Sequence, residues 1–449
     1  MMHLAEAAQA LGAKVKGADV EFTSVSTDTR TLRPGALFVA LRGERFDGHD
    51  FVAQALAAGA VAAMVDEKFV GEGALLVVED TRLGLGHLAA YWRGKFDLPL
   101  VAVTGSNGKT TVKEMIAAIL RAACGDDARV LATEGNLNND IGVPQMLLRL
   151  NAAHRYAVIE MGMNHFGEID YLSRMAAPNV ALVNNAQAAH LAGLGSVEGV
   201  ARAKGEIYGG LKAGGIAVIN ADDAYASLWR DLAAGKTILE FALDHSAAVS
   251  GSYQSLPDGV ELEIVVPQGK VRTRLNAAGV HNVRNALAAS AVASALNVPC
   301  EVIGQGLARF APVKGRLQRK PALHGATLID DSYNANPDSM RAAIDVLAAV
   351  SGKKVLVLGD MGELGEDAWA LHGEIGAYAK QRGIDVLFCL GDNARNMAAQ
   401  FGQNAWHFER IEELLADLEN LLASEVAVLV KGSRFMQMER VVKSFELKG

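Results

Sequence analysis

The sequence predicts an α/β protein of three domains, and three observations support this prediction. The chain has 449 residues, which is too long for one ordinary hydrophobic core. Short apolar runs alternate with helical segments, a pattern typical of strands buried in a parallel sheet. Breaks containing proline and glycine divide this alternation into three blocks, residues 1–98, 99–311 and 312–449.

The first block, residues 1–98, is expected to form a small α/β domain. It opens with "MMHLAEAAQALGAKVKG", which reads as a short amphipathic helix. Strand-like runs follow at 35–41 and 73–80, with an alanine-rich helix near 50–60 between them. Pro99 disfavours helix in the residue before it, so we expect the block to end there.

The second block, residues 99–311, is expected to hold a mostly parallel sheet. Its apolar runs, each followed by a polar or glycine-rich loop, lie at 100–105, 156–162, 180–186 and 216–220. Residues 261–275 form two runs around a Pro-Gln-Gly-Lys turn and predict an antiparallel hairpin appended to this sheet. A helix over 282–296 follows, and then a linking segment that contains Gly306, Pro312 and Gly315.

The third block, residues 312–449, repeats the alternation and predicts a second open α/β sheet. Its strand-like runs end in polar residues and lie at 327–334, 353–362, 385–392 and 426–433. Ligands of such sheets bind outside the carboxyl ends of the strands, so we expect functional side chains there.

Composition excludes several classes of protein. The formal net charge is −8, which gives no electrostatic reason to bind nucleic acid or an anionic membrane. No run of eighteen apolar residues is present, and the start lacks the layout of a signal peptide, so no membrane span is expected. The three scattered cysteines suggest neither a disulfide framework nor a zinc site, and they fit a cytoplasmic protein.

The stretch "TGSNGKTT", residues 104–111, predicts a phosphate-binding loop. The standard pattern would place a glycine at Val103, and here the first glycine comes two residues later. An apolar strand enters the loop and a helix from Lys109 leaves it, so backbone N–H groups and a helix N-terminus point at one spot. Lys109 would neutralise phosphate charge, Thr110 would ligate Mg²⁺ and Thr111 would bind phosphate. A plain strand-to-helix turn is the alternative. The loop residues between strand and helix are Gly105, Ser106, Asn107 and Gly108.

The pattern T-G-[ST]-x-G-K-[ST]-[ST] resembles the ATP loop of the Mur ligase family, the ATP-dependent amide-forming enzymes of cell-wall precursor synthesis. Folylpolyglutamate synthases are related to this family, and the ATP loop of neither group requires a glycine at the position of Val103. The resemblance covers the whole chain. It implies a small N-terminal UDP-binding α/β domain, a central P-loop-type ATPase domain with a mostly parallel sheet, and a C-terminal Rossmann-like α/β domain.

Five stretches resemble one branch of this family, at 26–51, 135–144, 330–340, 359–365 and 430–442. That branch implies an ATP- and Mg²⁺-dependent ligase, acting as a monomer, that joins D-alanyl-D-alanine to UDP-N-acetylmuramoyl-tripeptide through an acyl phosphate. The sibling that adds diaminopimelate or lysine has a D-N-P-[RA] signature, which we do not find here. That sibling, and a nucleotide-gated switch protein, are the alternatives.

The resemblance also implies metal-binding residues in the central domain. Glu160 ends an apolar run and resembles the metal-binding glutamate, as expected of a carboxylate beside a phosphate loop. His190 resembles a ligand of a second Mg²⁺. Lys204 resembles a lysine that is carbamylated and so supplies a carboxylate to that second metal. The alternatives are a surface carboxylate, a structural histidine and a solvated lysine.

Nucleotide contacts are implied around the second domain boundary. "GVHNVRNALAA", residues 279–289, resembles a family helix start in which Asn282 contacts adenine, with His281 and Asn285 as weaker candidates. Arg316 resembles an arginine that reaches the ATP phosphates. The stretch "DSYNANPDS" could be a simple turn. Its resemblance assigns Asp331 to the ribose or to Arg316, and Tyr333 and Asn336 to the base or ribose.

Substrate contacts are expected at three places. Short polar residues around the strand at 35–41 would bind uracil, and an arginine there would pair with the diphosphate. The loop "GNLNND" would face the sugar and peptide, and the cationic and hydroxyl groups after the last strand would bind the dipeptide carboxylate. A turn and solvent-facing charge are the respective alternatives. The candidates are Ser26, Thr27, Asp28, Arg30, Arg45, Asp47 and His49; Asn136, Asn138 and Asn139; and Lys431, Ser433 and Arg434.

Overall fold

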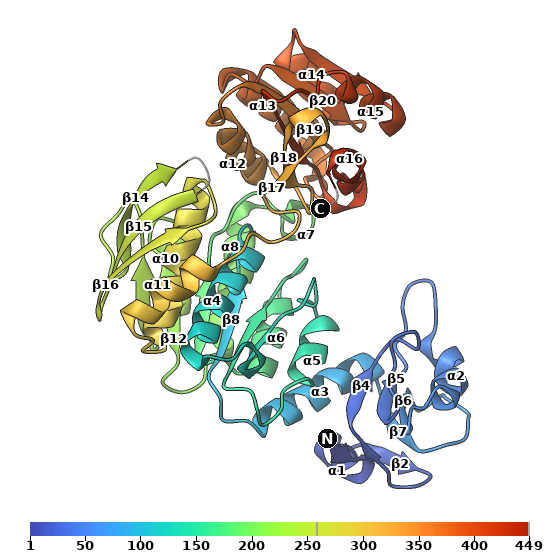
Figure 1. Cartoon of the computed structure of the whole chain (residues 1–449). Coiled ribbons are helices and arrows are strands. Elements are labelled where there is room, and N and C mark those ends of the chain that lie inside the picture. Colours follow the sequence, from blue (N-terminus) through green and yellow to red (C-terminus); the bar gives the residue numbers. More distant parts are fainter. Residues whose placement is uncertain (257–258, 448–449) are drawn as a thin grey trace.

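The computed structural model of the chain describes residues 1–256 and 259–447. It is a mixed α/β structure with the three lobes that Figure 1 shows from blue to red, and this confirms the predicted fold class. In the part described, no helix is both long and apolar enough to cross a membrane. Short 3-10 helices connect the main elements: η1 Gly48–Phe51, η2 Asp127–Arg129, η3 Glu206–Gly210, η4 Leu323–Gly325, η5 Gly365–Asp367 and η6 Arg434–Met436.

The N-terminal lobe has a five-stranded sheet in the order β2-β7-β6-β5-β4, parallel except for β2. Its α3 begins at the N-cap Asp80, whose side chain accepts hydrogen bonds from two backbone N–H groups. The helix packs against α5 and α6 of the central lobe. The elements are β1 Met2–His3, α1 Leu4–Leu11, β2 Lys14–Lys16, β3 Glu21–Phe22, β4 Ser24–Ser26, β5 Ala36–Val39, α2 Val52–Ala57, β6 Ala62–Asp66, β7 Leu75–Val78 and α3 Thr81–Gly94.

The central lobe is built on a six-stranded parallel sheet in the order β13-β12-β11-β8-β10-β9. All four apolar runs predicted as strands are strands, and β8 is buried on both faces. Strand order reverses at β8, so the carboxyl ends of β8, β10 and β11 enclose a crevice. The elements are β8 Leu100–Thr104, α4 Lys109–Cys124, β9 Val130–Ala132, α5 Gly142–Leu147, β10 Tyr156–Glu160, α6 Glu168–Ala176, β11 Val180–Val183, α7 Leu191–Leu194, α8 Val197–Gly205, β12 Ile216–Asn220, α9 Ala226–Leu232 and β13 Thr237–Phe241.

Two expectations about the end of this lobe are wrong. The hairpin of β15 (Gly259–Val266) and β16 (Gly269–Leu275) is antiparallel as predicted, but it joins β14 (Ser250–Leu256) in a separate three-stranded sheet. That sheet packs on α10 (Val280–Ala295) and α11 (Cys300–Arg309), which separate it from the parallel sheet. Gly306 is inside α11 rather than in a linker.

Gly306 lies in a helix because two helices meet closely there. A Cβ at this position would lie 2.3 Å from the Cα of Ile119 on α4. The glycine therefore reflects helix packing and not a chain break, a distinction that its sequence position does not make.

The C-terminal lobe has a six-stranded sheet in the order β17-β18-β22-β19-β20-β21, parallel except for the edge strand β17. All four predicted runs form strands of this sheet, whereas its two edge strands, β17 and β21, were not predicted. The elements are β17 Gln318–Pro321, β18 Thr327–Asp331, α12 Pro337–Ala348, β19 Lys353–Gly359, α13 Ala368–Gln381, β20 Val386–Leu390, α14 Ala394–Phe401, β21 Ala405–Phe408, α15 Ile411–Glu419, β22 Val426–Lys431 and α16 Glu439–Phe445.

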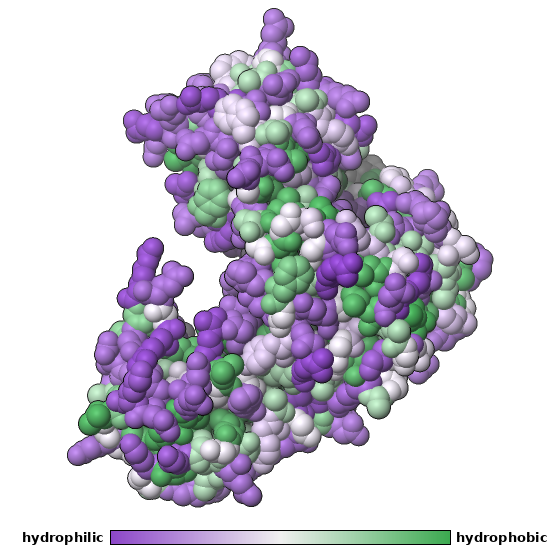
Figure 2. Space-filling model, turned by 180° about the vertical axis from the view of Figure 1, so that it is seen from behind, coloured by the Kyte–Doolittle hydropathy of each residue, from purple (hydrophilic) through white to green (hydrophobic). Residues whose placement is uncertain are grey.

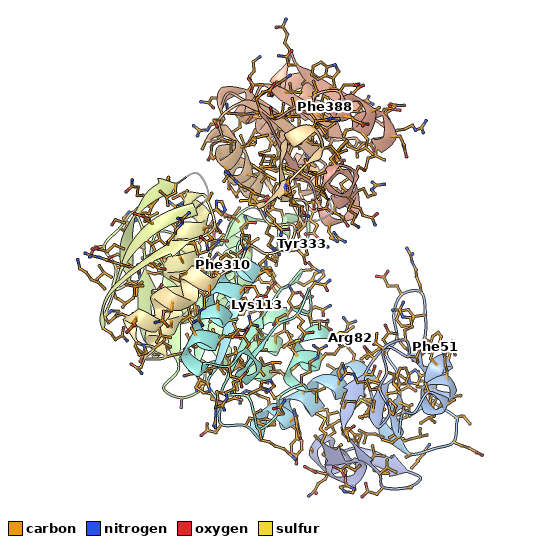
Figure 3. The ribbon with its side chains drawn as sticks, in the orientation of Figure 1. Phe51, Arg82, Lys113, Phe310, Tyr333 and Phe388 are labelled. Carbon is orange, nitrogen blue, oxygen red and sulfur yellow. The ribbon has the colours of Figure 1, made fainter. Side chains whose placement is uncertain are left out.

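The lobes are arranged so that the central one contacts both others. Figure 2 shows an open notch between the N-terminal and C-terminal lobes, with a mostly hydrophilic margin. In Figure 3, Arg82 marks the junction of the N-terminal and central lobes, and Tyr333 marks that of the central and C-terminal lobes. Arg82 donates a hydrogen bond of 2.8 Å to Asp140, which ties α3 to the loop before α5.

Candidate active site between the central and C-terminal lobes

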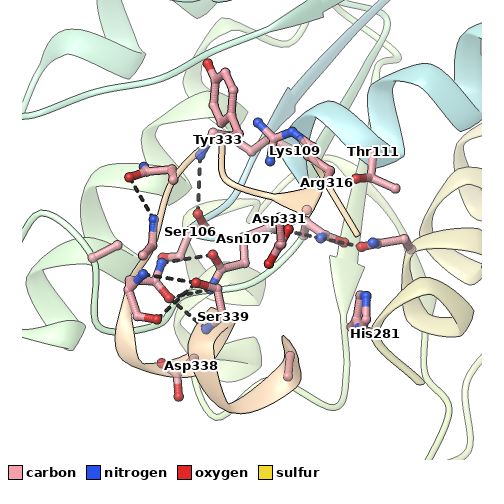
Figure 4. A pocket seen from close by; sticks show the side chains of 18 of the residues that line it. Ser106, Asn107, Lys109, Thr111, His281, Arg316, Asp331, Tyr333, Asp338 and Ser339 are labelled. Atoms are coloured by element: carbon pink, nitrogen blue, oxygen red, sulfur yellow. Dashed lines mark hydrogen bonds between the residues drawn. The ribbon is translucent and has the colours of Figure 1, made fainter. Parts of the chain in front are cut away.

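A cleft of about 1210 Å³ lies at the carboxyl ends of the central strands and is closed on one side by the C-terminal lobe. Figure 4 shows its phosphate-loop wall and its C-terminal wall facing each other. Most of the predicted site residues line it: Ser106, Asn107, Gly108, Lys109, Thr111, Asn136, Asn138, Asn139, Glu160, His190, Asn282, Arg316, Asp331, Tyr333, Asn336, Lys431, Ser433 and Arg434.

The phosphate loop connects β8 to α4, as the sequence predicts. Gly108 has a φ of 77°, and a Cβ there would lie 2.5 Å from the Oδ1 of Asn285, so only glycine fits without strain. Helix α4 starts at Lys109 with its N-terminus toward the cleft. The uncompensated N–H groups of this first turn favour an anion at that end.

Lys109 folds back over the loop. Its Nζ donates to the backbone oxygens of Gly105 at 2.6 Å and Ser106 at 3.4 Å. Burial lowers the pKa of Lys109, and the charge of Arg316 lowers it further, while Glu160 and Glu363 oppose the shift. A second cation this close to Lys109 is unfavourable unless an anion joins them, which is the situation expected at a phosphate site.

Asparagines after β11 hold the loop in shape, and sequence reasoning did not identify them. The side-chain oxygen of Asn185 accepts a hydrogen bond from the Asn107 backbone N–H at 2.8 Å, and its backbone oxygen accepts from Ser106 N at 3.0 Å. Asn184 donates to the Asn107 carbonyl at 3.0 Å. The available signal was "VALVNNA", because two amides directly after a buried strand fall at the crevice.

Glu160 is the best candidate for a metal ligand. It ends β10, is buried, and accepts a hydrogen bond from Asn138 Nδ2 at 2.8 Å through Oε1. Its Oε2 is buried and has no hydrogen-bond partner among the described residues. Leaving a buried carboxylate oxygen without a partner is unfavourable, and a cation beside it removes that cost. The residues present therefore fit a divalent cation at Glu160.

Two other predicted metal ligands, His190 and Thr110, each contact a side chain that comes from the C-terminal side of the cleft. Within residues 1–256 and 259–447, no group of three or more His, Cys, Asp or Glu side chains is arranged to hold a metal. His190 Nδ1 lies 2.7 Å from Glu363 Oε2 of the C-terminal lobe, a partner that the sequence did not suggest. Thr110 Oγ1 accepts a hydrogen bond from Arg316 Nη2 at 2.9 Å.

Lys204 is fully buried, so the alternative of a solvated helix lysine is wrong. Its Nζ lies 3.6 Å from the sulfur of Met163. Burial places the pKa of Lys204 well below its ordinary value, and the charge of Lys109 adds to this shift. The lowered pKa increases the fraction of Lys204 that is a neutral, nucleophilic amine.

The C-terminal wall brings Arg316 to the loop. Its guanidinium stacks over the Tyr333 ring at 4.3 Å from the centroid. Asp331 does not pair with Arg316, since its Oδ2 lies 2.6 Å from Lys431 Nζ and its Oδ1 accepts from the Leu317 N–H. Burial raises the pKa of Asp331, against the opposing charge of Lys431.

Lys431, Ser433 and Arg434 lie close in sequence at the end of β22, but each contacts different partners. Lys431 is buried in its pair with Asp331, so it is not a free cation for a carboxylate. Ser433 Oγ donates to Ala335 O at 3.2 Å and accepts from Gly362 N at 2.8 Å. Arg434 is exposed at the cleft and pairs with Glu439 at 3.0 Å.

The predicted adenine contacts lie together at the start of α10. Asn282 Nδ2 donates to Ala278 O at 2.8 Å, and Asn285 Oδ1 accepts from Asn184 at 3.0 Å, which links α10 to the loop after β11. Burial, together with the charges of Lys431 and Arg284, lowers the pKa of His281 to about 4. This imidazole is therefore neutral at physiological pH.

The predicted uridine contacts lie in the N-terminal lobe, outside this cleft. Asp28 accepts hydrogen bonds from Arg30, at 2.7 Å for Nη2, which lower the pKa of Asp28 to about 2. Burial would raise the pKa of Asp47, but hydrogen bonds from His49 and Arg42 outweigh it and lower the value to about 2. Thr27 Oγ1 accepts from Gln145 of the central lobe at 2.8 Å. Ser26 and Arg45 complete this set, and Arg45 is exposed.

Known proteins resemble the chain over its whole length. The family model described as "Mur ligase family, catalytic domain" matches residues 21–90, "Mur ligase middle domain" matches 103–293, and "Mur ligase, glutamate ligase domain" matches 315–434. The UDP-N-acetylmuramoyl-tripeptide–D-alanyl-D-alanine ligase of Escherichia coli (strain K12) is 44% identical over 450 residues, covering 99% of this chain and 98% of the relative.

Solved structures agree with that similarity. A crystal structure of MurF from Acinetobacter baumannii has a TM-score of 0.93 and 40% identity, covering 98% of both chains. The MurF ligase of Thermotoga maritima, solved in complex with ADP, has a TM-score of 0.83 and 28% identity, covering 94% of this chain and 96% of that one. With its phosphate loop, its three lobes and relatives that match it from end to end, the chain belongs to the Mur ligase family.

Proposed function

We propose that the chain joins D-alanyl-D-alanine to UDP-N-acetylmuramoyl-tripeptide with ATP, giving the UDP-linked pentapeptide, ADP and phosphate. One observation supports this most directly. A phosphate loop, a buried carboxylate with an unpartnered oxygen and an arginine from a second lobe line one cleft. The relatives that match nearly the whole chain carry this activity in their names, and one of them was solved with ADP.

The chemistry requires an activated carboxylate, because an amine does not displace hydroxide from a carboxylate in water. The tripeptide carboxylate oxygen takes the terminal phosphoryl group of ATP, and ADP leaves. The dipeptide amine then attacks the carbonyl carbon, loses its proton, and phosphate departs as the C–N bond forms. Lys109, Arg316 and the loop N–H groups would stabilise the negative charge that concentrates in the cleft.

Magnesium fits the residues of the central lobe. Glu160 would hold it through Oε2, with the hydroxyl of Thr110, and His190 and a carbamate on Lys204 would serve a second ion. Bound Mg²⁺ would supply positive charge opposite the phosphates. The carbamate would form when the neutral Lys204 amine attacks the carbon of CO₂ and releases a proton, which its low pKa favours.

We assign the remaining predicted residues to ligands in the same framework. Asn282, with Tyr333, would contact the nucleoside. The exposed residues around β5, above all Arg45, would bind the uridine diphosphate, and Ser433 with Arg434 would receive the dipeptide carboxylate. The units 1–98, 99–311 and 312–449 are proposed as domains of a cytoplasmic monomer.

The test is phosphate release from ATP and Mg²⁺ with UDP-N-acetylmuramoyl-tripeptide, comparing D-alanyl-D-alanine with single amino acids. The proposal expects release that requires both the tripeptide and the dipeptide, with the pentapeptide detected by mass. Turnover only with the UDP-linked dipeptide and diaminopimelate or lysine would assign the chain to the sibling ligase. Release that is indifferent to every amine would point to a nucleotide-gated switch.

A further inference from the structure

Two asparagines 229 residues apart form a reciprocal amide pair across the cleft. Asn336 Nδ2 donates to Asn107 Oδ1 at 2.9 Å, and Asn107 Nδ2 donates to Asn336 Oδ1 at 3.1 Å. Asn107 belongs to the phosphate loop, and Asn336 is the N-cap of α12 in the C-terminal lobe. Figure 4 shows Asn107 of the phosphate loop near Ser339 of α12. The pair joins the element that binds phosphate to a different lobe.

Each asparagine is also held by hydrogen bonds within its own lobe. Asn336 Oδ1 also accepts from the Ser339 N–H at 2.9 Å, which completes a capping box at the start of α12. The backbone of Asn107 is held by Asn185 and Asn184, and its side-chain Nδ2 donates to Gln187 Oε1 within the same lobe. Two side chains that are already immobilised lose little conformational entropy on pairing, so their contact can fix the position of one lobe relative to the other.

The same helix end makes another contact with the central lobe. Asp338 Oδ2 accepts from the Ala188 N–H at 3.3 Å, in the segment that follows Asn184 and Asn185. The N-terminus of α12 therefore docks against both the phosphate loop and the loop after β11. Asn336 is buried and its amide groups are engaged in these contacts, a role beyond the base or ribose neighbour that the sequence predicted.

We propose that Asn107 and Asn336 are positioning residues, whose amide pair sets the C-terminal lobe against the phosphate loop. On the proposed function, this alignment places the lobe that binds the dipeptide amine at the acyl phosphate formed beside the loop. The pair thereby makes the position of one lobe depend on the shape of the loop in the other. Its loss acts mainly on dipeptide KM and kcat, because the loop contacts to nucleotide lie within the central lobe.

A double-mutant cycle tests the pair. Serine at position 336 can still cap α12 but cannot reach Asn107, so Asn336→Ser removes the contact and preserves the helix start. We expect Asn107→Ala and Asn336→Ser each to lower kcat/KM for the dipeptide about tenfold, which corresponds to about 1.4 kcal/mol. Asn107→Ala also removes the hydrogen bond from Asn107 Nδ2 to Gln187 Oε1, so Asn336→Ser isolates the pair, and the double variant should lose no more than Asn107→Ala alone. Losses that multiply to about a hundredfold, or no loss in either single variant, would overturn the proposal.

Hydrogen exchange tests the contact without any ligation assay. Asn336→Ser should raise the exchange rates of amides in residues 105–111 several-fold, although the change lies in another lobe. Asn420→Ser, at an exposed asparagine that ends α15, is the matched control and should leave that segment unchanged. Unchanged exchange at 105–111 in Asn336→Ser would refute the pair as a positioning contact. If exchange responds but the wild-type chain does not ligate the dipeptide, the proposed function fails while the positioning role stands.

Discussion

The phosphate loop and the side of the N-terminal lobe that we propose to bind uridine differ in how completely the fold holds their predicted residues in place. Around the loop, Lys109 begins helix α4 and Glu160 ends the buried strand β10, and both line one cleft. In the N-terminal lobe, Asp28 and Arg30 satisfy each other at the surface. A site that must concentrate charge is preorganised by burial, whereas a recognition surface can keep its charges solvated until its ligand arrives.

This difference has a physical origin in the cost of burial. A buried ionisable group is stable only when partners or ligands compensate its lost hydration, so its environment reveals what it is made to bind. Exposed pairs such as Asp28–Arg30 contribute little to stability and reveal little about ligands. The following predictions test this comparison in order of decreasing effect.

The largest effect is expected from Lys109→Met in the phosphate loop. Removing the cation that faces the phosphates should lower kcat/KM by about 10²- to 10³-fold, because charge stabilisation in a desolvated cleft is strong. Steady-state phosphate release measures it. Lys270→Met, at an exposed lysine of β16, is the control and should retain activity. A loss of less than tenfold for Lys109→Met would show that the buried phosphate loop contributes no more to activity than the exposed residues of the N-terminal lobe.

Lys204→Met is expected to lower activity about 10²-fold, because it removes the group that can carry the carbamate. Since burial lowers the pKa of Lys204 well below its ordinary value, more of its amine is neutral and able to react with CO₂. ¹³C NMR of protein treated with ¹³C-bicarbonate should show a carbamate signal in the wild type that Lys204→Met lacks. A wild type without this signal, fully active in bicarbonate-free buffer, would contradict the carbamate.

His281 should make the fold less stable in mild acid. Its folded pKa of about 4 lies below the unfolded value of about 6.5, so the unfolded chain binds the proton more readily between these values. Stability should therefore fall as pH decreases, by about 2 kcal/mol between pH 7 and pH 5 from this group. Urea unfolding at both pH values measures it, with His281→Gln as the comparison. An equal pH dependence in His281→Gln would contradict the assignment.

The smallest effect is expected in the N-terminal lobe. Arg45 is exposed, and its loss should raise KM for the UDP-linked substrate only about fivefold, with kcat unchanged. Arg30→Ala should have a smaller effect, because Asp28 already holds that guanidinium. Initial rates at varied substrate concentration measure both. A thousandfold loss of activity for Arg45→Ala would contradict the comparison, because substitution of an exposed residue would then cost as much activity as substitution in the buried phosphate loop.

Patterns of apolar residues predicted four strands of each large sheet, but they did not predict the edge strands β9, β13, β17 and β21. Runs such as 100–105 and 426–433 are strands because burial on both faces of a parallel sheet leaves no polar alternation. The hairpin over 261–275 was correct as a pair of strands but was assigned to the wrong sheet. Alternation fixes a strand's two faces and says nothing about which neighbour covers them. The expectation that Gly306 lies in a linking segment was wrong for a related reason, because this glycine lets α11 approach α4 closely.

Local chemistry of the chain by itself determined the phosphate loop, the strand-end position of Glu160 and the family to which the protein belongs. These depend on residues that are close in sequence, where backbone geometry leaves few arrangements. Tertiary structure alone decided that Lys204 is buried, that Asp331 pairs with Lys431, and that Asn107 meets Asn336. Burial and pairing across lobes arise from packing between distant segments, and no local pattern encodes which side chains will face each other there.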